Sequence, residues 1–140
     1  MGKSEIRISK YETISNVETL ITKNNYPIKY DLEERTEKFA REIILLCKQI
    51  HRDTINIELV SQLIRSSGSV GANYIEANES VSKKDFSHRI KICRKEAKES
   101  RYWLKLLISA NIDFKEKIAP HIQEATELMN IFGAIVKKCL

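Results

Sequence analysis

The sequence predicts an all-α protein, an antiparallel up-down four-helix bundle with an N-terminal extension. The 140-residue chain contains only 4 Gly and 2 Pro, whereas sheets need frequent turns. Its apolar residues recur at intervals of three and four along four long segments, and no period-2 strand pattern competes. Four amphipathic helices with short connections pack most simply as an up-down bundle.

The length corresponds to one domain, which we place at residues 30–140, preceded by an N-terminal arm at residues 1–29. Hydrophobic residues make up 42% of the chain and charged residues 31%, a globular balance. Four apolar residues of the arm have helical spacing and favour a short helix from Tyr11 to Lys23: Ile14, Val17, Leu20 and Ile21.

The first long helix is predicted from Asp31 to about His51. Asp31 can accept hydrogen bonds from the free amides of the first turn, and Glu34 follows three residues later, as in a capping box. The apolar stripe of this helix steps by three and four residues. It consists of Thr36, Phe39, Ile43, Leu46 and Ile50.

The second helix is predicted from about Asn56 to Asn78, and its middle is rich in small residues. Gly68 and Gly71 each cost the helix about 1 kcal/mol relative to alanine. We expect close approach of another backbone to compensate; a kink is the alternative. The stripe of this helix is Val60, Leu63, Ser67, Val70, Tyr74 and Ala77, with Ile64, Gly71 and Ile75 alongside.

The third helix is predicted to begin after Ser82, a good N-cap with Asp85 three residues later, and to end near Ala110. Its stripe is Phe86, Ile90, Cys93, Ala97, Ser100, Leu104 and Leu107. The fourth helix is predicted to start near Pro120, because proline suits the first helical position. Its stripe is Ile122, Ala125, Met129, Phe132, Val136 and Cys139, widened by Leu128 and Ile135.

The third helix concentrates the positive charge of a chain whose formal net charge is +5. From Ser82 to Ala110 there are nine basic and three acidic residues, a net charge of +6, so the rest of the chain sums to −1. Seven of the basic residues fall within an arc of about 120° of the helix. Such a stripe is either a solvated face or a binding surface for phosphates. The seven are Lys84, Lys91, Arg94, Lys95, Lys98, Arg101 and Lys105.

A second apolar stripe lies on another side of the same helix, formed by Ile92, Trp103 and Leu106. A helix in a monomeric bundle needs one apolar stripe only. The second stripe therefore predicts another surface to cover, either the N-terminal arm or a neighbouring subunit, with Trp103 as an interface anchor. Packing of Trp103 at the edge of the core is the alternative.

Catalytic and metal-binding patterns are hard to find. The chain has no Gly-rich phosphate loop and no Cys-x-x-Cys pair, and a single Asp85-x-x-His88 does not supply the ligands of a di-iron bundle. We therefore expect no enzymatic activity, no catalytic residues, no metal and no cofactor. The chain has no apolar run of membrane-spanning length and no signal-peptide core, which favours a cytoplasmic protein without membrane contact. Buried, reduced thiols are expected at Cys47, Cys93 and Cys139.

Several motifs resemble one known family. They are Tyr30-Asp31-Leu32, the segment from Ser61-Gln62-Leu63 to Asn73-Tyr74-Ile75-Glu76-Ala77, and Ser82-Lys83-Lys84-Asp85-Phe86. On these motifs, residues 30–138 resemble the four-helix-bundle proteins encoded in intervening sequences of bacterial 23S ribosomal RNA genes. The chain departs from that pattern at Ala77, where the family has glycine, and near Gly71, where proline is frequent.

The resemblance implies an antiparallel bundle that assembles as a ring-shaped homo-oligomer, a pentamer, without established enzymatic activity. The chain is also similar to the accessory bundle proteins of retroelements, which associate with nucleic acid through a basic surface. The leading hypothesis is thus a homo-oligomeric bundle that binds RNA or other nucleic acid through the basic stripe. The second is a protein-interaction adaptor that docks its partner around Ile92, Trp103 and Leu106.

Overall fold

The computed structural model describes residues 32–139, which form four α-helices and one short 3-10 helix. The predicted N-terminal arm and its short helix lie outside these residues. The elements are α3 (Leu32–Cys47), α4 (Thr54–Asn78), α5 (Lys83–Ala110), η1 (Ile112–Phe114) and α6 (Lys115–Lys138).

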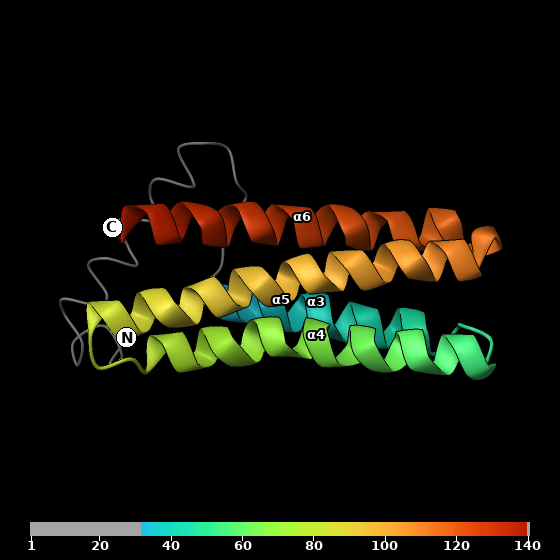
Figure 1. The fold of residues 1–140 in the computed structure, drawn as a ribbon, viewed down its shortest axis with the longest axis horizontal. Coiled ribbons are helices and arrows are strands. Elements are labelled where there is room, and N and C mark those ends of the chain that lie inside the picture. The colour runs from blue at the N-terminus through green and yellow to red at the C-terminus, as the bar shows by residue number, and fades with distance from the viewer. Residues whose placement is uncertain (1–31, 140) are drawn as a thin grey trace.

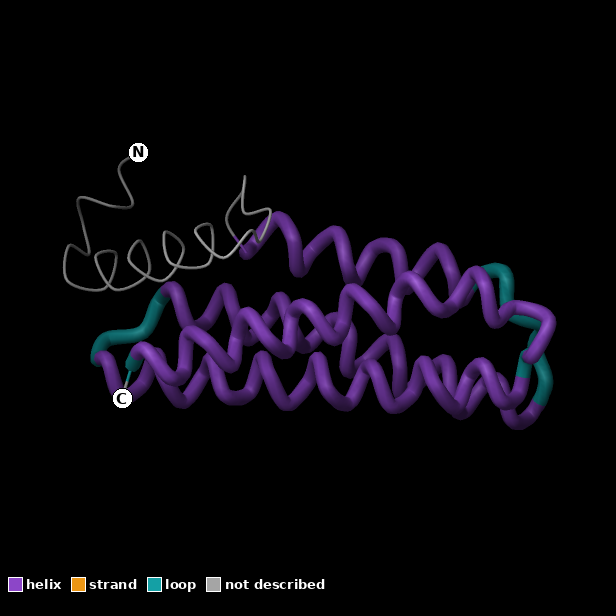
Figure 2. Tube along the Cα trace, turned by 90° about the horizontal axis from the view of Figure 1, so that it is seen from above, coloured by secondary structure: helices purple, strands orange, loops and turns teal. Residues whose placement is uncertain are grey.

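Each helix runs back along the one before it, so the connections alternate between the two ends of the bundle (Figures 1 and 2). α5 lies between α4 and α6 and packs extensively on both, whereas α3 packs mainly on α4 and touches α6 much less. This arrangement confirms the predicted all-α, antiparallel four-helix bundle. Among residues 32–139, no helix has the length and apolarity that a membrane crossing requires.

The core is made largely of the predicted stripes, one from each helix, although Val60 of α4 is only half-buried and Ile118 and Ile131 of α6 are buried without having been predicted. Burial of these side chains is the main favourable contribution to folding. In α6 the buried stripe is centred on Ala125, Leu128 and Ile135, while Ile122, Met129 and Val136 are only half-buried at its edge. The largest fully buried side chains include Ile43 of α3, Leu63 and Tyr74 of α4, Phe86, Ile90 and Leu104 of α5, and Ile118, Leu128 and Phe132 of α6.

Small residues of α4 bring its neighbours close. A Cβ atom on Gly71 would lie 2.9 Å from Thr36 Oγ1, so α3 approaches α4 more closely there than an alanine would allow. The hydroxyls of Ser66 and Ser100 lie 2.9 Å apart between α4 and α5. A Cβ on Gly68 would meet nothing within 4 Å. The close-packing prediction is therefore right for Gly71 and wrong for Gly68.

The start of α5 is as predicted, and the start of α4 is not. The Ser82 side chain accepts a hydrogen bond from the Asp85 amide at 3.0 Å, which caps α5. α4 begins at Thr54, two residues before the predicted Asn56. Its N-cap is Asp53, whose carboxylate accepts from the Asn56 amide at 2.7 Å.

Two further helix ends differ from prediction. α3 ends at Cys47 rather than near His51, and a turn follows it. α6 begins at Lys115, so Pro120 lies inside the helix and not at its first position. Pro120 cannot donate a backbone hydrogen bond. The first turn of α6 nevertheless forms, because it places Ile118 in the core with 0% of its surface exposed.

Candidate nucleic-acid interface

The basic stripe lies on the outward side of α5. Its five lysines are all exposed, as is Arg94, while Arg101 is half-buried. All seven residues lie on one continuous helix and share one arc of it, so they form one surface, which we call the basic face. The lysines of the basic face are Lys84, Lys91, Lys95, Lys98 and Lys105.

The two arginines of the basic face lean toward α6. Arg101 Nη1 lies 3.5 Å from Thr126 Oγ1, and the side chain of Arg94 passes over Gly133, with its Nε 3.7 Å from where a Cβ would stand. Gly133 therefore leaves room for the Arg94 side chain. The arginines extend positive charge across the seam between α5 and α6, while the lysines project from α5 itself.

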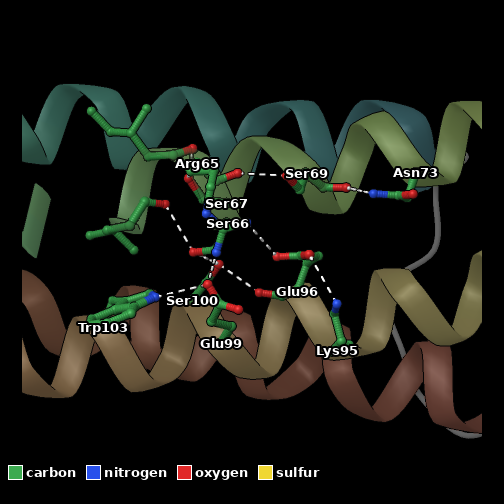
Figure 3. A network of polar contacts seen from close by, with 12 residues as sticks. Arg65, Ser66, Ser67, Ser69, Asn73, Lys95, Glu96, Glu99, Ser100 and Trp103 are labelled. Carbon is green, nitrogen blue, oxygen red and sulfur yellow. Dashed lines mark hydrogen bonds and ion pairs between the residues drawn. The ribbon is translucent and has the colours of Figure 1, made fainter. Parts of the chain in front are cut away.

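The acidic residues in the middle of α5 turn toward α4 (Figure 3). Glu96 is buried, with 7% of its surface exposed, and lies 3.4 Å from Arg65 Nη1 of α4. Glu99 forms an ion pair with the same arginine. Lys95 also reaches Glu96, at 3.8 Å. Arg65 thus draws both carboxylates to the α4 side, and the outward lysines keep most of their positive charge uncompensated.

A hollow of about 450 Å³ lies where the start of α5 meets the end of α6. Three lysines line it together with the half-buried Cys139. Burial raises the pKa of Cys139, and the positive charge of Lys83 partly opposes that rise. The hollow is lined by Lys83, Lys84, Ser87, His88, Lys91 and Cys139. Sequence reasoning missed His88 and Cys139 as its members, although antiparallel packing of the last two helices places the end of one beside the start of the other.

The cysteines differ in burial. Cys47 and Cys93 are buried as predicted, and burial raises their pKa values to about 11 and about 12. Cys139 is half-buried, so the prediction of a buried thiol is wrong there. It lies one residue beyond the last helical residue of α6, where fewer neighbours cover it.

The second apolar stripe is only partly exposed. Ile92, Trp103 and Leu106 are all half-buried. Trp103 packs against the core, and its Nε1 donates a hydrogen bond to Glu99 Oε2 at 3.1 Å. Within its own chain, Trp103 therefore packs at the edge of the core, as the alternative prediction stated. A role of this stripe between subunits stays a prediction.

More strongly exposed apolar side chains lie between α3 and α4. Ile44, Ile57 and Ile64 are 47%, 47% and 41% exposed, and they line an apolar groove of about 450 Å³. Sequence reasoning placed Ile64 beside the core stripe and missed this groove. The seven-residue spacing of Ile57 and Ile64 was the available signal, because it places both on one side of α4.

Among residues 32–139, no group of three or more His, Cys, Asp or Glu side chains could hold a metal ion. Glu96 and Glu99 do converge, but on Arg65, and Glu76 is exposed. Asp85 belongs to the capped first turn of α5, as expected for Asp85-x-x-His88.

The fold and this surface define an antiparallel four-helix bundle with a basic central helix. Residues 29–134 match the model of the 23S rRNA-intervening sequence protein family. The chain belongs to that family.

Solved structures agree with the assignment. The chain is similar to a crystal structure of a protein of unknown function from the S23 ribosomal protein family of Bacteroides thetaiotaomicron VPI-5482. The two share 30% sequence identity over 76% of this chain and 99% of that chain, with a TM-score of 0.68. Among curated proteins, none matches this chain.

Proposed function

We propose that this protein is a non-enzymatic, homo-oligomeric bundle that associates with RNA or other nucleic acid through the basic face of α5. The observation that carries the proposal is the separation of charge on α5. Its lysines project outward, while Glu96 and Glu99 are paired with Arg65 on the α4 side. A surface of this kind suits the phosphates of a nucleic-acid backbone.

The hollow at the end of the bundle supports the same proposal. Lys83, Lys84 and Lys91 continue the basic face around Cys139. The family description, 23S rRNA-intervening sequence protein, connects its members with a ribosomal RNA context. RNA is therefore the first nucleic acid to test.

The test is binding of a mixed RNA pool at several salt concentrations, with Lys91, Lys95 and Lys98 together replaced by glutamate. The affinity should fall strongly, and the slope of log K against log salt should decrease by about 2 to 3, because three phosphate contacts are lost. A matched control replaces three exposed cations outside the basic face, Lys48, Arg52 and Lys115, by glutamate. Both variants carry the same net charge, so equal losses would contradict a specific surface.

Cys139 provides a readout in the unaltered protein. Its half-buried thiol lies in the basic hollow. RNA bound there should slow alkylation of Cys139, followed by mass spectrometry. If saturating RNA left the alkylation rate of Cys139 unchanged, the hollow would not be part of the RNA-binding surface.

Assembly is tested by light scattering coupled to size exclusion. The family resemblance favours a pentamer, about five times the 16.2 kDa of one chain. A particle of that size that gains mass with RNA at low salt, and loses it at high salt, would support both parts of the proposal. A monomer that still binds RNA would be consistent with RNA binding by the basic face and would contradict the proposed homo-oligomer.

A protein-interaction adaptor without direct nucleic-acid binding is the second candidate. The apolar groove between α3 and α4 favours it, since Ile44, Ile57 and Ile64 leave much of their surface exposed. A pull-down from nuclease-treated lysate separates the two functions. A partner retained by the wild type and lost from Ile64→Glu would favour the adaptor, provided the protein itself binds no RNA.

A further inference from the structure

An exposed aromatic ring stands within the basic face. Tyr102 is 55% exposed. It follows Lys98 by four residues and precedes Lys105 by three, so at about 100° per residue it falls inside the same arc as the lysines. Among residues 32–139, Tyr102 belongs neither to the buried core nor to the half-buried side chains packed against it.

The ring is held at one side by its neighbour. The rings of Tyr102 and Trp103 meet edge to face, with centroids 5.0 Å apart and an interplanar angle of 71°. Trp103 is fixed in turn by its hydrogen bond to Glu99, which is paired with Arg65 (Figure 3). A chain of contacts from α4 therefore steadies Tyr102 while leaving more than half of its surface open.

A steadied aromatic ring among lysines suits a nucleic acid whose bases are unpaired. Successive bases stack on aromatic side chains in proteins that bind single strands, and each such contact contributes about 1–3 kcal/mol. In an A-form duplex the bases are stacked on one another, so only the phosphates and the shallow groove can be contacted. Lysines alone bind both forms, because they contact the phosphates, which single strands and duplexes both carry.

We propose that Tyr102 is a base-stacking platform and that the basic face selects single-stranded over double-stranded nucleic acid. The inference rests on the proposed nucleic-acid binding and adds its preferred form. Lys98 and Lys105, about one helical turn to either side of the ring, pair with phosphates that flank the stacked base.

The experiment measures binding of three RNA probes of equal length to the full chain: an unstructured single strand, the same strand annealed to its complement, and an abasic strand. Tyr102→Ala should weaken binding of the ordinary single strand about 5- to 150-fold, the equivalent of one lost stacking contact. Its affinities for the duplex and for the abasic strand should equal those of the wild type.

Two further variants separate stacking from simple apolar contact. Tyr102→Phe keeps the aromatic face and should bind the single strand as the wild type does. Tyr102→Leu keeps an apolar side chain without the face and should resemble Tyr102→Ala. In all three variants the salt dependence should stay unchanged, because no cation has been removed.

The outcomes distinguish this inference from the proposed function. If wild type and Tyr102→Ala bound the single strand equally well, the stacking platform would be overturned and phosphate binding would remain. The same conclusion would follow if the wild type bound single strand and duplex with equal affinity. Failure of all three probes to bind at low salt would overturn both. A single-strand preference that disappears with Tyr102→Ala and returns with Tyr102→Phe would establish the platform.

Discussion

Asn56 of α4 and Asn111 at the end of α5 exchange two side-chain hydrogen bonds. Asn56 Nδ2 donates to Asn111 Oδ1 at 2.9 Å, and Asn111 Nδ2 donates to Asn56 Oδ1 at 2.8 Å. Asn111 also reaches the Leu107 carbonyl at 2.9 Å, and Asn56 reaches the His51 carbonyl at the same distance. One amide pair thus joins the entry of α4 to the exit of α5.

Replacing either asparagine should destabilise the bundle more than the pair itself contributes. Asn56 is only 3% exposed. In Asn111→Ala, the buried side-chain amide of Asn56 loses the group that donates to its Oδ1 and the group that accepts from its Nδ2. We expect a loss of about 1–3 kcal/mol in the free energy of unfolding for each single variant. The double variant Asn56→Ala, Asn111→Ala should lose less than the sum. A double-mutant cycle by urea unfolding measures the coupling, and strict additivity would contradict the reciprocal contact.

Gly71 and Gly68 should respond oppositely to alanine. At Gly71 the new Cβ would lie 2.9 Å from Thr36 Oγ1, which is itself held by the Leu32 carbonyl at 2.7 Å. Gly71→Ala should therefore destabilise the protein by about 1–3 kcal/mol, despite the higher helix propensity of alanine. Gly68→Ala meets open space and should stabilise it by up to about 1 kcal/mol. Urea midpoints that move in the same direction would disprove the close contact between α3 and α4.

Arg35 provides the main polar connection between α3 and α6, the adjacent helices that touch least. Its Nε and Nη2 donate to Glu124 at 2.9 and 2.8 Å, and Nη2 also reaches Glu127 at 2.9 Å. The side chain is 13% exposed, so Arg35→Ala should cost about 1–2 kcal/mol.

Arg41→Ala is the matched control for Arg35→Ala. Arg41 pairs with Glu37 on the exposed surface of the same helix, and loss of that contact should cost less than about 0.5 kcal/mol. Equal losses in chemical denaturation would mean that Arg35 contributes no more than a surface pair.

Helical spacing predicted the buried stripes of α3, α4 and α5 and the basic face, but in α6 it missed the buried Ile118 and Ile131. Residues such as Ile43, Leu63 and Ile90 repeat with the period of the helix, and a stripe on one helix is defined by that period alone. The start of α4 was missed although its cap is local, since Asp53 precedes Asn56 by only three residues; the bond from Asn56 to Asn111 is the part that depends on the fold. The start of α6 was missed because the burial of Ile118 outweighs the local preference of Pro120.

The parts of the candidate site that involve two helices could not be predicted from spacing. The basic hollow needs Cys139 of α6 beside His88 of α5, and the lean of Arg94 depends on the absence of a side chain at Gly133. The position of Tyr102 could be predicted from the sequence alone, since its spacing from Lys98 places it in the arc of the basic face. It was missed because only charges were followed along that side of the helix.

His121 should make the stability of the bundle depend on pH. It lines the groove between α3 and α6 with Arg35 and Phe39. Burial lowers the pKa of His121 below its ordinary value of 6.5, and the nearby carboxylates of Glu42 and Glu124 only partly oppose this. Between the lowered pKa and 6.5 the unfolded chain binds more protons than the folded chain, so the free energy of unfolding rises with pH in that window.

As the pH falls below about 6.5, the contribution of neutral His121 to stability is therefore lost progressively, and the loss levels off below the folded-state pKa. His121→Gln should remove this part of the pH dependence, as measured by urea unfolding from about pH 5 to 7.5. His121→Asn, which also removes the imidazole, should change the slope in the same way. If wild type and His121→Gln differed by a constant amount across this range, or if the wild type gained stability relative to His121→Gln on acidification, the burial of a neutral His121 between α3 and α6 would be refuted.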